Sequence, residues 1–125
     1  EAVLHALNQV ARSLSSKVHT IDSRQRLMLH TAAVFASNYT NLMYIISNDI
    51  LAGSNLPADA LQPLILETAR KAASGNPKAM QTGPARRNDT LTLEKHLTAL
   101  ASIPEYAELY KLLASIITKK FNKPI

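Results

Sequence analysis

Apolar side chains recur every three or four residues in residues 27–48, a stretch that contains no Lys, Arg, Asp or Glu. This spacing places them on one side of an α-helix. We expect the helix to run from about residue 24 to about residue 51, a length of about 40 Å. Asp22 or Ser23 should form its N-cap, and Gly53 should end it. The apolar positions are Met28, Ala32, Phe35, Ala36, Tyr39, Leu42, Met43, Ile46 and Ile50.

The opposite side of this helix carries uncharged hydrogen-bonding groups. A helix face in contact with water usually carries Lys and Glu, which favour helix and are well solvated. We therefore expect this side to be buried against a neighbouring helix, a second subunit, a ligand or another domain, where each amide and imidazole can find a partner. The set, here called the chargeless stripe, consists of His30, Ser37, Asn41 and Asn48, with Asn38 and Tyr44 at its edges.

The rest of the chain predicts an all-α fold, a helical bundle around this long central helix. Further helices are expected over residues 2–14, from Pro57 to about residue 74, over residues 90–101, and from the capping pair Ser102 and Glu105 to about residue 121. Residues 78–81 can form one helical turn, and residues 82–89 are expected to be a loop.

One short segment does not fit the helical pattern. Residues 18–21 are rich in β-branched side chains and form the only strand-like segment of the chain. A lone strand has nothing to pair with inside a helical domain. We expect it to belong to a sheet outside this chain, which places a domain boundary near residue 21 and divides the chain into residues 1–21 and 22–125.

Composition narrows the class of protein. The chain has 125 residues, 46% hydrophobic and only 3 Gly, which fits a single helical domain. The absence of Cys excludes disulfides and thiolate metal sites and fits the cytoplasm. We expect neither a membrane span nor a secretory signal. The charge of +5 is scattered over the sequence, whereas a nucleic-acid binder more often concentrates it, so no nucleic acid is expected.

Residues 82–89 carry the chain's most suggestive local chemistry. Arg86 and Arg87 stand just before a predicted helix start, where they can bind an anion. Asp89 can cap that helix or hold Arg87. The alternative, a surface turn with two solvated arginines, is favoured by the local pattern alone. His30 and His96 are each as compatible with a structural role as with proton transfer.

No complete catalytic set is present in the sequence. It lacks a glycine-rich phosphate loop, the H-E-x-x-H metal motif and the Gly-x-Ser-x-Gly elbow, and it pairs no carboxylates on its helical faces. No metal site is expected.

Four segments together resemble one known family. They are HTAAVFASN at 30–38, LILET at 64–68, TGPARRND at 82–89, and His96-Leu97. The family is the C-terminal helical domain numbered 2520 among domains of unknown function, which follows a Rossmann-like domain in proteins classed as NADP-dependent oxidoreductases. The resemblance covers about residues 18–121. It implies a fold similar to the C-terminal domain of 6-phosphogluconate dehydrogenase.

The same resemblance implies a function. Residues 1–21 would be the last helix and strand of the preceding Rossmann domain, and residues 22–125 a substrate-binding and homodimerisation domain. The parent protein would use NADP, whose binding motif this chain lacks, on a small-molecule substrate. The candidate catalytic residues are His30 and His96, and the candidate substrate-binding residues are Asn38, Asn41, Arg87 and Asp89. The alternative is a non-catalytic helical module for homodimerisation.

Overall fold

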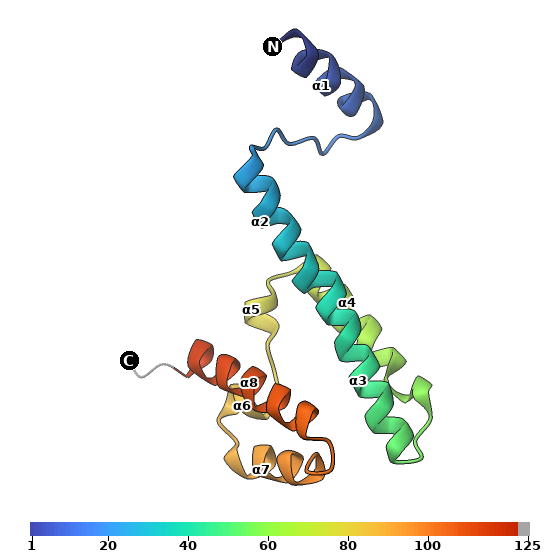
Figure 1. Cartoon of the computed structure of the whole chain (residues 1–125), viewed down its shortest axis with the longest axis vertical. Coiled ribbons are helices and arrows are strands. Elements are labelled where there is room, and N and C mark those ends of the chain that lie inside the picture. The colour runs from blue at the N-terminus through green and yellow to red at the C-terminus, as the bar shows by residue number, and fades with distance from the viewer. Residues whose placement is uncertain (123–125) are drawn as a thin grey trace. The chain divides into compact units, whose positions relative to one another are not determined.

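The computed structural model describes residues 1–122, and every regular element in this range is helical (Figure 1). The predicted all-α class is therefore confirmed. The chain divides into two compact units, Glu1–Ile45 and Ile46–Ile125, which are described separately. The elements are α1 (Ala2–Leu14), α2 (Ser23–Ala33), the π-helix η1 (Val34–Tyr39), α3 (Thr40–Gly53), the 3₁₀-helix η2 (Ala58–Leu61), α4 (Gln62–Ser74), α5 (Pro77–Met80), α6 (Pro84–Arg87), α7 (Thr90–Ala99) and α8 (Pro104–Phe121).

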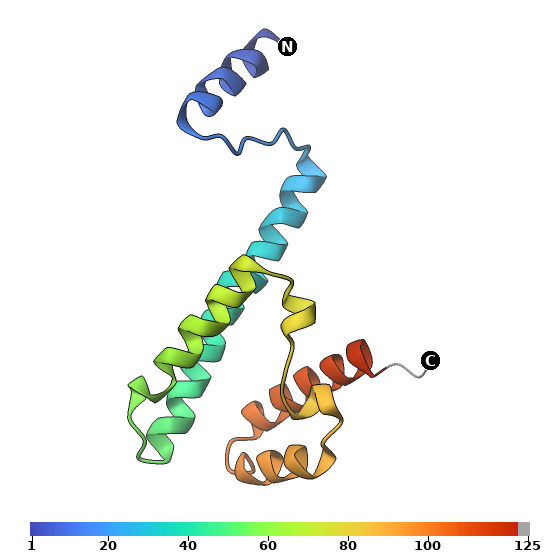
Figure 2. The same ribbon diagram turned by 180° about the vertical axis from the view of Figure 1, so that it is seen from behind.

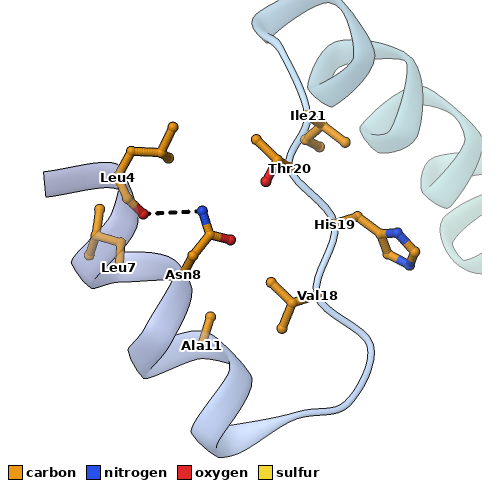
Figure 3. A pocket seen from close by; sticks show the side chains of 8 residues that line it. All are labelled: Leu4, Leu7, Asn8, Ala11, Val18, His19, Thr20 and Ile21. Atoms are coloured by element: carbon orange, nitrogen blue, oxygen red, sulfur yellow. Dashed lines mark hydrogen bonds between the residues drawn. The ribbon is translucent and has the colours of Figure 1, made fainter. Parts of the chain in front are cut away.

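In the first unit, α1 is followed by an extended segment and not by a strand. Residues 18–21 lie beside α1, and Figure 3 shows Val18 and Thr20 turned toward the helix side that carries Asn8 and Ala11. The strand-like expectation is thus not confirmed, because a strand is defined by ladder hydrogen bonds and residues 1–122 supply no partner strand. The two segments enclose an open, mainly apolar groove of about 270 Å³.

The long helix begins where the sequence predicts. The Asp22 carboxylate accepts the backbone N–H of Gln25 at 2.7 Å, and the Gln25 side chain accepts the backbone N–H of Asp22 at 2.9 Å, which forms a capping box. Helical structure then continues from Ser23 to Gly53 through three consecutive elements.

A π-helical turn interrupts this α-helical run, which the sequence did not predict. The hydroxyl of Thr40 donates to the carbonyl of Phe35, five residues earlier, at 3.0 Å. The rings of Phe35 and Tyr39 pack edge to face with centroids 5.0 Å apart. A π-turn accommodates one additional residue, so the side chains that follow it are displaced by about 100° from the α-helical register.

The second unit begins with the end of α3, where Leu51 is buried. The next α-helix starts at Gln62, later than predicted, because Pro63 lacks an N–H and is accommodated in a first helical turn. The preceding residues after Pro57 form only the 3₁₀-turn η2. The predicted turn near residue 78 is present as α5.

Helices α6, α7 and α8 pack on one another in the C-terminal part of the second unit (Figure 2). Residues 82–89, expected to be a loop, contain the single turn α6. Ala85 in this turn is buried, and its carbonyl accepts hydrogen bonds from Asn122 Nδ2 at 3.1 Å and from the Thr118 hydroxyl at 3.4 Å. The turn is thereby fixed to the end of α8.

The expected capping pair of α8 does not form. Pro104 occupies the first turn, which makes Ile103 the N-cap residue, and Ile103 has no side-chain acceptor. Ser102 therefore lies one position too early to cap with Glu105.

Large apolar side chains remain exposed on several helices. Of residues 1–122, only Leu51 and Ala85 are buried hydrophobic positions. In α1, Val3, Leu7 and Val10 share one side, and each is more than half exposed. Phe35, in the π-turn, is 64% exposed. Apolar faces on this scale are typical of surfaces that contact other protein.

Candidate functional site

The candidate residues of the first unit lie on the long helix. His30 is in the last turn of α2, Asn38 in the π-turn and Asn41 at the start of α3, and all three are exposed. The π-turn changes their alignment. The additional residue brings Asn38, and not Ser37, into line with His30, and it turns Asn41 away by about 100°. The chargeless stripe is therefore not continuous through Asn41.

The candidate residues of the second unit come from α6 and α7. Asp89 is the N-cap of α7, where its two oxygens accept from the backbone N–H of Thr92 at 3.1 Å and from the hydroxyl of Thr92 at 2.7 Å. The Thr92 hydroxyl bond, followed by the backbone bond, lowers the pKa of the Asp89 carboxyl. These contacts confirm the capping role that the sequence allowed for Asp89.

The two arginines of α6 differ in their surroundings. The guanidinium of Arg86 lies 4.9 Å from the ring centroid of Phe121, in a cation–π arrangement. Arg87 is exposed and forms no ion pair within the part of the chain that the structure describes. Its backbone precedes Asn88, which adopts a left-handed conformation with a φ of 56°, a region that Asn enters more easily than most residues. Arg87 thus differs from Arg86 in lacking a ring contact within residues 1–122, although both arginines are exposed.

His96 has a partner that the sequence did not reveal. Its Nδ1 lies 2.7 Å from the hydroxyl oxygen of Tyr110, and the two rings pack at 82° with centroids 5.7 Å apart. His96 is exposed on α7, whereas Tyr110 on α8 is half-buried. Burial raises the pKa of the Tyr110 phenol, which keeps the phenol protonated near neutrality.

Tyr110 also forms part of the wall of a small apolar hollow. The hollow has a volume of about 200 Å³ and lies entirely in the second unit, under the turn that begins at Thr82 and Gly83. Leu93 and Leu113 contribute apolar walls from α7 and α8. Gly83, with a φ of 101°, supports the turn in a conformation that other residues rarely adopt. The site thus combines an apolar recess with a histidine–tyrosine pair.

Neither a metal cluster nor a membrane span is present in the described chain. No three His, Asp or Glu side chains of residues 1–122 gather closely enough to hold a metal ion. Over the same range, no helix combines the length and the apolar character that a bilayer crossing requires.

These features define an all-α domain with a histidine–tyrosine pair beside an apolar recess and, within residues 1–122, no sheet that could hold a dinucleotide. The profile of the domain of unknown function DUF2520 matches residues 1–117, and the chain belongs to this family.

A solved structure supports the family assignment. The chain is similar to a crystal structure from Bacteroides fragilis described as a "putative NADP oxidoreductase", with 46% identity and a TM-score of 0.81. The similarity covers 89% of this chain and 43% of the other, so the chain spans less than half of that protein's length. No curated protein matches the chain.

Proposed function

We propose that the chain is the substrate-binding and dimerisation half of an NADP-dependent oxidoreductase. The observation that carries this proposal is the 46% identity to the Bacteroides fragilis protein over 89% of this chain. On this proposal, residues 1–21 are the last helix and strand of a preceding Rossmann domain, and residues 22–125 form the helical domain. The cofactor would bind mainly to the preceding domain. We place the protein in the cytoplasm, because its lack of Cys fits a compartment where disulfides are rare.

The groove in Figure 3 supports this division of the chain. The side of α1 that carries Asn8 and Ala11 faces the extended residues 18–21. Leu4, Leu7 and Ile21, which also line the groove, remain exposed. A neighbouring parallel strand would satisfy the backbone of residues 18–21, and the rest of the sheet would cover the apolar side of α1.

In the complete enzyme, the candidate residues would take separate roles. Arg87 would bind an anionic group of the substrate or of the cofactor, since a guanidinium can form paired hydrogen bonds to carboxylate or phosphate. His30 or His96 would exchange a proton with the substrate as NADPH reduces it, because an imidazole nitrogen can both donate and accept a proton. Asn38 and Asn41 would bind substrate carbonyl or amide groups. Asp89 would act indirectly, through the start of α7.

NADPH binding tests the proposal. Fluorescence titration should show binding by the longest gene product that contains this chain and no comparable binding by residues 1–125 alone. The longer protein should also consume NADPH with at least one member of a panel of small ketones, 2-oxo acids and cyclic imines. A longer protein that neither binds nor oxidises NADPH would contradict the proposal.

The exposed apolar side of the long helix favours dimerisation as a second candidate function. Leu27, Met28 and Phe35 are each more than half exposed on it. If this face joins two copies, Phe35→Asp should convert a dimer to a monomer in sedimentation velocity, whereas Leu91→Asp, at an exposed position of α7, should not. A dimer whose longer form lacks oxidoreductase activity would favour the homodimerisation module alone.

A further inference from the structure

The pairing of His96 with Tyr110 gives the two ring nitrogens of the imidazole different surroundings. A neutral imidazole has one nitrogen that donates and one that accepts. Nδ1 faces the Tyr110 hydroxyl at 2.7 Å. No hydrogen bond is formed by Nε2 within residues 1–122, and the side chain of His96 is exposed. Nε2 is therefore the nitrogen that can meet a ligand.

The surroundings of Tyr110 indicate the direction of this hydrogen bond. The phenol is held between α7 and α8 and is neutral near pH 7, because burial disfavours its charged form. A neutral phenol has a single proton to donate, and the imidazole nitrogen is the stronger acceptor of the two partners. Donation from Tyr110 to Nδ1 leaves the imidazole proton on Nε2.

We propose that Tyr110 is a positioning residue that holds His96 with Nε2–H directed outward, as a hydrogen-bond donor to the substrate atom that gains negative charge. The proposal deepens the proposed function and rests on it. The recess under the turn at Gly83 adjoins Tyr110, so an apolar part of the substrate can pack beside the pair. The substrate class that fits is a small carbonyl or imine compound with an apolar side group.

The hydrogen bond can be observed without any substrate. We expect ¹⁵N nuclear magnetic resonance of histidine-labelled protein, recorded in alkaline buffer, to show the imidazole proton of His96 on Nε2 and an acceptor at Nδ1. Tyr110→Phe should abolish the acceptor signature. Tyr106→Phe is the matched control, because Tyr106 lies one turn earlier on α8 and bonds to Asp49 instead. A wild-type proton on Nδ1 would overturn the proposal.

Two substitutions of His96 test which of its ring nitrogens contributes to activity. The amide nitrogen of Gln lies near the place of Nε2, and that of Asn near the place of Nδ1. With the panel compound that the longer protein reduces fastest, His96→Asn should lower kcat ~100-fold, as expected for loss of a donor to a developing anion. His96→Gln should retain kcat within ~10-fold of wild type, because it keeps an outward donor. Tyr110→Phe should lower kcat ~10-fold with little change in KM.

The outcomes distinguish the role of Nε2–H from the proposed function. Equal decreases of kcat in His96→Asn and His96→Gln, or full activity in both, would overturn the role of Nε2–H. Either result would still be compatible with an NADP-dependent enzyme. Absence of any NADPH oxidation by the wild-type protein would refute the proposed function, and the substrate role of His96 with it. The resonance experiment alone then decides whether Tyr110 orients the imidazole.

Discussion

The hydroxyl of Tyr106 in α8 donates a hydrogen bond to the carboxylate of Asp49 near the end of α3, at 2.5 Å. The two residues are 57 positions apart in the sequence, and both belong to the second unit. This bond connects the first helix of the unit to its last one. The Asp49 carboxylate raises the pKa of Tyr106, chiefly through the hydrogen bond, with burial as the next cause.

The raised pKa predicts a loss of stability at alkaline pH. Because the folded pKa lies above the unfolded one, the contribution of Tyr106 is complete below the unfolded value of about 10 and is lost as the pH rises through the folded value. Urea unfolding should show that the free energy of unfolding falls more between pH 8 and pH 11 in wild type than in Tyr106→Phe. An identical pH dependence in the two proteins would contradict this account.

Replacement of Leu51 should destabilise the second unit. Leu51 is 9% exposed, and Leu51→Ala removes buried methyl groups and leaves a cavity, at a cost of about 2 kcal/mol in the free energy of unfolding. Leu66, in α4, is 70% exposed and provides the control, since Leu66→Ala should cost less than about 0.5 kcal/mol. Urea titrations followed by circular dichroism measure both values. Equal effects would show that Leu51 is not a core residue.

Asn88 should tolerate glycine and reject β-branched residues. Its φ of 56° places it in the left-handed region between α6 and α7. Asn88→Val should lower the free energy of unfolding by about 1–2 kcal/mol, the cost of that conformation for an ordinary side chain. Asn88→Gly keeps the conformation accessible and should be near neutral. Thermal unfolding of the two variants measures the difference. Unchanged stability in Asn88→Val would contradict the left-handed conformation at this position.

The cap at Asp89 should make the start of α7 sensitive to acid. The lowered pKa of Asp89 means that the cap is complete above the ordinary aspartate range and is lost as the pH falls through the lowered value. Asp89→Ala should speed hydrogen exchange at the Thr92 amide at neutral pH, and Asp89→Asn should largely restore protection, since Asn also caps helices. Unchanged exchange in Asp89→Ala would show that another group caps α7.

The parts of the fold that follow from local chemistry were predictable from the sequence. Asp22 and Asp89 cap helices because their carboxylates reach backbone N–H groups three residues ahead. Asn88 takes the left-handed conformation because its short polar side chain tolerates it. In each case, all the interacting atoms belong to residues no more than three positions apart in the sequence.

The parts that depend on distant residues were not predictable. His96 was identified as a candidate, but its partner Tyr110 lies 14 residues away on another helix, and no spacing rule links them. The π-turn was missed because Val34–Tyr39 has the composition of an ordinary apolar helix. The roles assigned to Asn38, Asn41 and Arg87 remain predictions, because the proposed function places their binding partners outside this chain.

The π-turn has a consequence for how this helix tolerates change. Deleting one residue from Val34–Tyr39 would let the segment relax into an uninterrupted α-helix, since the surplus residue is what widens the turn. The shortened protein should keep its helix content and keep Asn41 on the same side relative to His30 as in wild type, because the deletion removes the residue that the π-turn accommodates. By contrast, a substitution that turned the segment into a regular α-helix at unchanged length would rotate Asn41 by about 100° relative to His30. The widened turn thus lets the chain carry one more residue here without altering which sides the helix presents before and after it.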